Sequence, residues 1–166
     1  MEFVSPTNGT MTMEEVLEDL DQFIFAGPHE KFKLIIGTDS QPGNSYTGKG
    51  KVAKRTCFVT AVIIHREGKG ARYYYRKVYR HPFHSMKQRI MEETGISLEL
   101  ALSLIDRMAT NYPELAIEIH LDVGQKGRSK EIIQQVVGII TTNGFAAMVK
   151  PFSFGASKVA DRYTKN

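Results

Sequence analysis

The sequence predicts a single mixed α/β domain in which helices flank a five-stranded sheet, with an additional helix at the N-terminus. Three apolar, strand-like runs come first, at residues 33–39, 55–65 and 71–80, and turn-forming segments separate them as in an antiparallel meander. Helical and strand-like patterns then alternate to the end of the chain, which is typical of crossovers between parallel strands. With 166 residues and no linker or repeat, we expect residues 31–166 to form one domain and residues 1–30 to supply a helix that packs on it.

The first helix is expected to begin at Thr12. Thr12 and Glu15 form a Thr-x-x-Glu capping box, in which the hydroxyl and the carboxylate each accept a backbone N–H that is free at a helix start. Apolar residues recur at helical spacing as far as Phe25, and the Ala-Gly-Pro sequence at 26–28 ends the helix.

The remaining elements follow from local patterns. The first strand ends at Asp39, and the Ser-Gln-Pro-Gly-Asn sequence after it predicts a turn, followed by a glycine-rich loop over 44–51. Residues 67–70 predict the hairpin that joins the next two strands. The later elements are a helix over 85–111, a strand over 115–122, a helix over 129–142, a strand over 145–150 and a last helix over 156–165.

Basic residues are concentrated in one part of the chain. The net charge is only +4, but Glu67 is the only acid between Lys49 and Arg89. Such a block can attract a polyanion such as nucleic acid, or it can be a set of solvated faces and charged edges that prevent strands from aggregating. The residues expected to contact a nucleic-acid backbone are Lys49, Lys51, Lys54, Arg72, Arg76 and Lys158.

Tyrosine and arginine interleave on the strand at 71–80. Because side chains alternate between the two faces of a strand, the tyrosines lie on one face and the arginines on the other. We expect the tyrosines to pack under a helix and some of the arginines to contact phosphate. The residues of the tyrosine face are Tyr73, Tyr75 and Tyr79.

The single cysteine and the absence of long apolar segments indicate the compartment. Cys57 lies in an apolar run, so it reads as a small buried residue with no internal disulfide partner. No basic and apolar leader and no uninterrupted apolar run of about 18 residues occurs. We therefore expect a cytoplasmic protein that does not enter a membrane.

Two aspartates follow apolar strands directly. Asp39 and Asp122 each end a strand and precede a turn with glycine, so each side chain opens onto the rim of the sheet. Taken singly, each is explained by turn chemistry. If the two strands are neighbours, however, the carboxylates converge and repel, which favours a bound divalent cation. Oxygen ligands alone point to Mg²⁺ or Mn²⁺.

Three motifs resemble the YkuK-type ribonuclease H-like family over nearly the whole chain. They are Gly-Thr-Asp-Ser-Gln at 37–41, His-Leu-Asp-Val-Gly at 120–124 and Ala-Ser-Lys-Val-Ala-Asp-Arg-Tyr-Thr-Lys at 156–165. The resemblance implies a ribonuclease H-like sheet with the strand order 3-2-1-4-5. Nuclease chemistry is implied only through the wider superfamily.

The superfamily also implies a set of four acidic positions that hold two metal ions. These positions are Asp39, a glutamate of the 85–111 helix, Asp122 and Asp161. The two ions would activate a water and stabilise the leaving oxygen of a phosphodiester, and Asp39 would bridge them. Asp161 is the least regular member, because a carboxylate on a short terminal helix can equally face solvent or pair with a neighbouring base.

The helix glutamate can be chosen from the helical wheel. At about 100° per residue, Glu93 lies roughly 90° from the centre of the apolar face, so it borders the buried side of the helix. Glu99 lies on the opposite side, although its Leu-Glu-Leu-Ala context resembles the helix acid of other ribonuclease H-like proteins. We therefore expect Glu93 as the ligand, with Glu99 as the alternative.

His120 shares a strand face with Asp122. It could order the scissile phosphate or relay a proton, or it could be a hydrogen-bonded structural histidine. Two functions stay open at this point. The first is a metal-dependent nuclease acting on RNA, RNA–DNA hybrid or structured DNA, and the second is a nucleic-acid-binding module of the same fold without catalysis.

Overall fold

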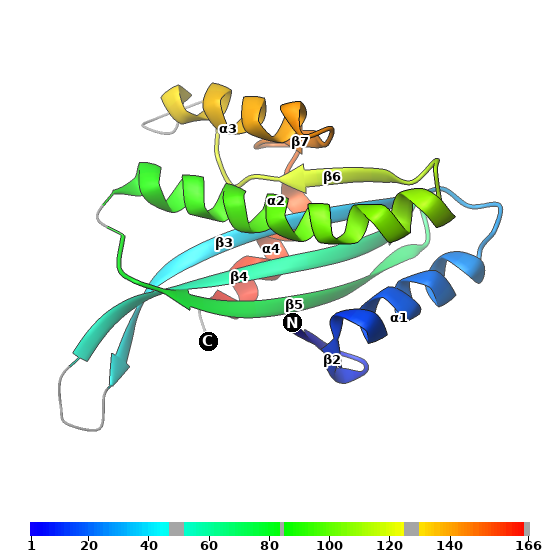
Figure 1. The fold of residues 1–166 in the computed structure, drawn as a ribbon, viewed down its shortest axis with the longest axis horizontal. Helices are drawn as coiled ribbons and strands as arrows, with labels where there is room; N and C mark the ends of the chain where they lie inside the picture. The colour runs from blue at the N-terminus through cyan, green and yellow to red at the C-terminus, as the bar shows by residue number, and fades with distance from the viewer. Residues whose placement is uncertain (47–51, 84, 125–129, 165–166) are drawn as a thin grey trace.

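The computed structural model describes residues 1–46, 52–83, 85–124 and 130–164, without the side chains of residues 42–46, 52–54, 130, 131, 154 and 157. Within them, a mixed sheet carries helices on both faces (Figure 1). The helices are α1 (Met13–Phe25), α2 (Met86–Asn111), α3 (Lys130–Thr142) and α4 (Phe154–Thr164). The strands are β1 (Glu2–Ser5), β2 (Gly9–Thr12), β3 (Phe32–Tyr46), β4 (Val52–Arg66), β5 (Gly70–Arg80), β6 (Ala116–His120) and β7 (Ala146–Met148).

The sheet has the order β2-β1-β5-β4-β3-β6-β7. β3, β4 and β5 form the antiparallel meander, whereas β6 lies parallel to β3 and β7 lies parallel to β6. The mixed α/β class is therefore confirmed, but the expected number of five strands is wrong. The two additional strands come from the N-terminal segment, where only a helix was expected.

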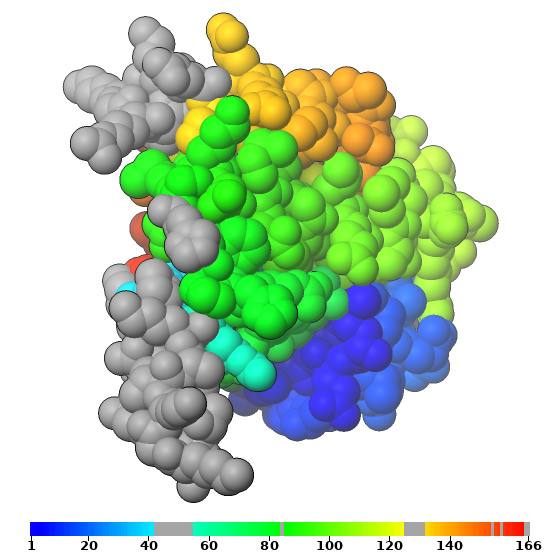
Figure 2. Space-filling model, turned by 60° about the vertical axis from the view of Figure 1, so that its left-hand side comes forward, coloured from blue at the N-terminus to red at the C-terminus, as the bar shows by residue number. Residues whose placement is uncertain are grey.

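β1 and β2 form a hairpin at the free edge of β5. Val4 pairs with Tyr75, and Phe3 and Met11 are buried in the main core. Each strand has only four residues, too few for a clear alternation of apolar and polar side chains. Figure 2 shows this N-terminal segment, in blue, packed against the body of the molecule.

The first helix forms as its sequence predicts. The Thr12 hydroxyl accepts the Glu15 N–H at 3.3 Å, and the Glu15 carboxylate accepts the Thr12 N–H at 2.7 Å, which completes the capping box. Asp19 on the same helix then anchors α1 to β5. Its carboxylate accepts hydrogen bonds from Arg72 and from the Tyr74 hydroxyl, each at 2.5 Å.

The turn expected after Asp39 is wrong. β3 continues to Tyr46 and stays paired with β4 down to the register Tyr46↔Val52. β6 pairs with β3 only as far as Ile36, so β3 is an edge strand at Pro42, where a proline is tolerated. Beyond the end of β5, β3 and β4 continue as a two-stranded extension (Figure 1).

The two faces of the sheet carry different helices. On one face, Leu20 of α1, Leu100 of α2 and Val136 of α3 share a large core cluster with Leu34 and Ile64 of the sheet. On the opposite face only α4 packs, among the described residues, through two small clusters around Ala156 and Ala160. None of the described helices combines the length and apolar character needed to cross a membrane.

A close approach between β3 and α4 fixes the position of the C-terminal helix. A Cβ atom at Gly37 would lie 2.5 Å from the Cβ of Ala156 and 2.8 Å from the carbonyl oxygen of His120. Side chains do not approach this closely without displacement, so only glycine allows α4 to pack at this distance. This contact brings α4, with Asp161 in its C-terminal half, against the strand that carries Asp39.

Candidate metal and nucleic-acid site

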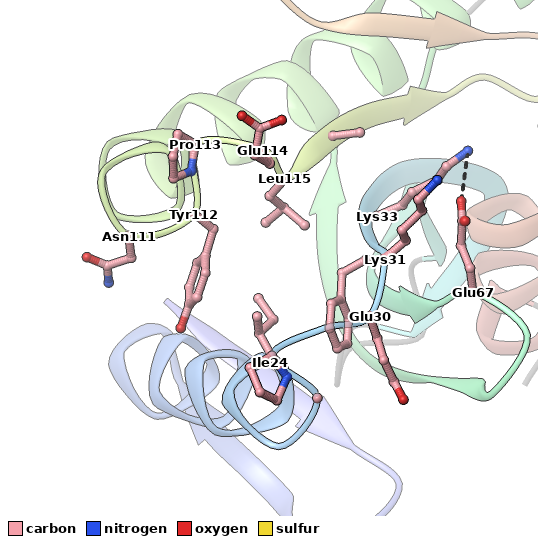
Figure 3. A pocket seen from close by; sticks show the side chains of 14 residues that line it. Ile24, Glu30, Lys31, Lys33, Glu67, Asn111, Tyr112, Pro113, Glu114 and Leu115 are labelled. Atoms are coloured by element: carbon pink, nitrogen blue, oxygen red, sulfur yellow. Dashed lines mark ion pairs between the residues drawn. The ribbon is translucent and has the colours of Figure 1, made fainter.

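Two cavities lie at different ends of the sheet. The larger one, about 550 Å³, lies between the C-terminal ends of α1 and α2 and the beginnings of β3 and β6 (Figure 3). Lys33 pairs there with Glu67 at 3.9 Å, and Glu30 pairs with Lys69 at 2.5 Å. No site residue predicted from the sequence lines it.

The second cavity, about 360 Å³, contains the acidic residues. It lies where β3 passes the N-terminal half of α2 and where the chain leaves β6. Its lining residues are Asp39, Ser40, Met86, Arg89, Ile90, Glu93, Asp122, Gly124 and Lys150. The structure therefore brings Asp39, Glu93 and Asp122, from three separate parts of the sequence, to one cavity, which we call the acidic cavity.

Asp39 projects toward the face of the sheet opposite to its neighbours Thr38 and Ser40. The Thr38 hydroxyl lies 3.0 Å from that of Thr60 and 2.8 Å from that of Ser97 on α2, which ties the strand to the helix. Burial raises the pKa of Asp39, and the negative charges of Asp122 and Asp161 raise it further. The N–H of Ser40 and the charge of Arg89 oppose this rise.

Glu93 is the most buried acid of the cavity, at 9% exposure. The Ser40 hydroxyl donates a hydrogen bond to its Oε1 at 2.5 Å. Burial raises the pKa of Glu93 to about 8, and the charges of Asp39 and Asp122 add to this rise, whereas the Ser40 hydrogen bond and Arg89 oppose it. At neutral pH Glu93 therefore tends to hold a proton, and a cation that replaces this proton would offset the repulsion from Asp39 and Asp122.

Asp122 is the most exposed of the three acids. Its Oδ1 forms an ion pair with the Nζ of Lys150 at 2.8 Å. Lys150 follows β7, and its N–H donates to the carbonyl oxygen of Val123 at 2.9 Å, so the backbone holds the two residues beside each other.

Asp161 lies on α4, which packs on the face of the sheet toward which Asp39 projects, whereas Glu93 comes from α2 on the opposite face. Asp161 is half-buried and does not line the acidic cavity, but its charge contributes to the raised pKa of Asp39. Lys158, one turn earlier on α4, is exposed.

His120 does not line the acidic cavity. It is buried on the α4 face, where its Nε2 lies 3.1 Å from Glu118 Oε2, and Glu118 also pairs with Lys33 at 3.2 Å. Burial lowers the pKa of His120, although the charge of Glu118 opposes this effect. These contacts match the structural alternative for this histidine.

The other predicted residues lie in varied surroundings. Glu99 is exposed on α2, outside the acidic cavity, and its charge acts on Arg76. Arg76 lies 6.0 Å from the ring of Phe3, and Arg72 pairs with Asp19, so the fold already uses both arginines. Lys49 and Lys51 lie outside the described residues, as does the side chain of Lys54.

Two of the three tyrosines, Tyr73 and Tyr75, pack under α4 as expected, whereas Tyr79 does not. Tyr75 stacks on Tyr163 of α4 with ring centroids 3.8 Å apart, and the Tyr73 hydroxyl lies 3.0 Å from that of Tyr163. Tyr79, near the end of the strand, is 55% exposed.

Three polar residues of the cavity were not predicted as site residues. Arg89 lies four residues before Glu93, so the helical spacing that selected Glu93 could also have selected it. Lys150 comes two residues after β7, which runs parallel to β6, so the strand-end argument used for Asp122 applied to it as well. Ser40 gave no such signal, because its role depends on how α2 packs over β3.

The side chains do not form a ready-made metal centre. Among the described residues, no three His, Cys, Asp or Glu side chains form a group that could hold an ion as they stand. Asp122 faces Lys150, and Glu93 faces Ser40. The donor set nevertheless fits a hard divalent cation, since it consists of carboxylate oxygens whose mutual repulsion a cation would relieve.

A sheet with an antiparallel meander, parallel crossovers and an acidic cavity at this position defines a ribonuclease H-like protein. The family model described as "Ribonuclease H-like" matches residues 15–165, so the chain belongs to the ribonuclease H-like family. It is also 34% identical, over 178 residues, to "Uncharacterized protein YkuK" of Bacillus subtilis (strain 168). That similarity covers 98% of this chain and 96% of the relative, which confirms the YkuK-type assignment. No solved structure matches the chain.

Proposed function

We propose that the protein is a divalent-metal-dependent nuclease that hydrolyses phosphodiester bonds in RNA, RNA–DNA hybrid or structured DNA. The observation that carries this proposal is the convergence of Asp39, Glu93 and Asp122 on one cavity, where burial and mutual repulsion raise the pKa of Asp39 and Glu93. Buried acids that repel one another destabilise a fold until a cation binds, and groups with such perturbed pKa values cluster at functional sites. Membership of the ribonuclease H-like family supports a nucleic-acid substrate.

Asp39, Glu93 and Asp122 would hold Mg²⁺ or Mn²⁺, with Asp161 completing the set from α4. Two bound ions would supply the positive charge that activates the attacking water and stabilises the leaving oxygen. In the hydrolysis, the water oxygen forms a new bond to phosphorus and the P–O ester bond breaks. One product then ends in a phosphate and the other in a hydroxyl group.

The chain's own residues prepare this site. The Ser40 hydroxyl fixes the orientation of Glu93 through its hydrogen bond to Oε1. The hydroxyl contacts among Thr38, Thr60 and Ser97 hold α2 against β3, and so set the separation between Glu93 and Asp39. Lys150 neutralises Asp122 and must release it when an ion binds.

The substitutions Asp39→Asn and Asp122→Asn test the proposal. With Mn²⁺, the wild-type protein should cleave a labelled RNA, hybrid or branched DNA, and both variants should lose cleavage while they keep nucleic-acid binding. Asp106→Asn is the matched control, because Asp106 is exposed on the distal half of α2. Cleavage that persists unchanged in both variants would reject this site.

A non-catalytic nucleic-acid-binding module is the second candidate. It is favoured by the ion pair between Lys150 and Asp122 and by the lack of a ready-made metal group among the residues that the structure describes. Calorimetric titration with Mn²⁺ separates the two candidates. A nuclease gives saturable heat that Asp39→Asn abolishes, whereas a binding module gives heat with oligonucleotides alone.

A further inference from the structure

Arg89 is a cation that lines the acidic cavity. It lies on α2, one turn before Glu93, and its charge acts on both Glu93 and Asp39. In the described part of the chain, its guanidinium makes no hydrogen bond or ion pair with another side chain, unlike Arg72, Arg80 and Arg107. A guanidinium presents five N–H donors in a planar fork that matches two phosphate oxygens. Arg89 therefore has the donors to bind an anion in the cavity.

Lys150 provides a second cation that can move. Its side chain is 54% exposed and pairs with Asp122, which is itself exposed. An exposed ion pair of this kind contributes little to stability, so the ammonium group can exchange partners. A phosphate entering the cavity offers the Lys150 ammonium group an alternative partner. When Lys150 moves to the phosphate, Asp122 is freed.

Two large apolar side chains are exposed, one in the lining of this cavity and one in the turn that carries Lys150. Met86 lines the cavity at 48% exposure, and Phe152, two residues after Lys150, is 68% exposed. The N–H of Phe152 donates to the carbonyl oxygen of Val149 at 2.8 Å, which closes a turn around Lys150. The turn therefore carries an exposed aromatic ring beside a cation that lines the site.

We propose that Arg89, Lys150 and Phe152 bind a single-stranded segment of nucleic acid. Arg89 contacts one phosphate, and Lys150 exchanges from Asp122 to a phosphate. Phe152 stacks on an unpaired base. The inference rests on the proposed function in taking a phosphodiester strand as the ligand of the acidic cavity. Base stacking on an aromatic ring needs an unpaired base, because the bases of an intact duplex already stack on each other. The structure thus assigns a strand that is single at the point of contact.

Fluorescence anisotropy with labelled oligonucleotides in a chelator tests this proposal without metal or cleavage. Single-stranded DNA and RNA should bind more tightly than the corresponding blunt duplexes, and comparison of the two single strands identifies the preferred sugar. Phe152→Ala should weaken single-strand binding by about tenfold, while Phe152→Trp should retain it. Arg89→Ala should weaken binding and reduce the slope of log K against log salt by about 0.7, the value for one phosphate contact on a single strand.

Two exposed residues outside the cavity provide matched controls. Lys87→Ala removes a cation from the same helix, and Phe25→Ala removes a ring that is 82% exposed at the end of α1. Both should bind like the wild type. Phe152→Ala should leave the salt slope unchanged, which separates stacking from charge.

The outcomes distinguish this inference from the nuclease proposal. Wild-type affinity in both Phe152→Ala and Arg89→Ala, or equal binding of duplex and single strand, overturns the inference even if the protein cleaves nucleic acid. Conversely, weakened binding in both variants of a protein that cleaves nothing upholds the inference and counts against the nuclease. Thermal unfolding of each variant verifies that it is folded.

Discussion

Asp19 and Glu93 are helix carboxylates on the same side of the sheet, but the fold treats them in opposite ways. Asp19 accepts hydrogen bonds from Arg72 and Tyr74 on β5 and from Asn8 between β1 and β2, so donors from two segments compensate its charge. Glu93 receives one hydroxyl, from Ser40, and its nearest charges include Asp39 and Asp122. The first arrangement holds α1 on the sheet, whereas the second leaves negative charge for a ligand to neutralise.

This difference separates structural acids from candidate functional acids in this fold. A paired carboxylate contributes stability, because its removal leaves donors without an acceptor. A crowded and buried carboxylate costs stability until a cation arrives. Substitutions at the two positions should therefore change stability in opposite directions, and this contrast can be tested.

The largest effect is expected at Glu93 and depends on pH. The pKa of Glu93 is about 8 in the folded chain, above its ordinary value of 4.5, so the folded state binds more protons than the unfolded state between these values. The contribution of Glu93 to the free energy of unfolding is then largest below pH 4.5, and it is lost as the pH rises toward 8. In a chelator at pH 8, Glu93→Gln should be more stable than the wild type by on the order of 3 kcal/mol, and at pH 4.5 the two should be equal.

Urea unfolding at several pH values measures this effect. Glu99→Gln is the control, since Glu99 is exposed on the same helix, and it should follow the wild type at every pH. With saturating Mn²⁺ the order should reverse, because the ion stabilises only the chain that binds it. A pH profile that is the same for Glu93→Gln and the wild type would contradict the contrast with Asp19.

Asp19→Asn should give the next largest effect, with the opposite sign. Asparagine keeps the shape of the side chain but removes the negative charge to which Arg72 and Tyr74 donate. We therefore expect the free energy of unfolding to fall by about 1–3 kcal/mol at pH 7. Thermal or urea unfolding measures it. Glu18→Gln, an exposed neighbour on α1, should change stability little. Manganese binding should stay unchanged in both variants. A loss of binding in Asp19→Asn would contradict the assignment of Asp19 to structure and Glu93 to metal binding.

Ser40→Ala should give the smallest effect, at the position that orients Glu93. The Ser40 hydrogen bond lowers the pKa of Glu93, so its removal should raise the midpoint of the Glu93 titration. Carbon NMR of the labelled carboxyl group measures that midpoint, and metal affinity should fall by about tenfold. Ser40→Thr, which keeps a hydroxyl, should restore both values. An unchanged midpoint in Ser40→Ala would assign Ser40 to packing alone.

Local sequence patterns anticipated most elements of the fold. The capping box at Thr12 and the helical spacing over α2 report interactions between residues close in sequence, which are visible in the chain itself. The β1–β2 hairpin could not be seen in this way, because four-residue strands gain their stability from pairing with β5. The turn expected at Pro42 failed for the same reason, since pairing with β4 overrode local composition.

The acidic cavity could be anticipated to a similar extent. Strand ends selected Asp39 and Asp122. The family resemblance implied an acid on the long helix, and the helical wheel chose Glu93 among its glutamates. The structure brings all three to one cavity. The pairing of His120 with Glu118, and the use of Arg72 by Asp19, depend on which faces meet in three dimensions. A single sequence does not contain that information until the helices are placed.

The contact of Gly37 with Ala156 links the distance between α4 and β3 to the length of the acidic side chain at position 161. Because both residues are small, van der Waals contact alone sets how near α4 lies to β3, and a larger residue at either position would move the helix outward. With α4 this close to β3, an aspartate at position 161 is long enough for its charge to act on Asp39. If the helix were displaced outward, the additional methylene of glutamate, about 1.5 Å, would be needed to bring the carboxylate equally near. Among relatives, the size of the residues at positions 37 and 156 should therefore vary together with the choice of Asp or Glu at 161.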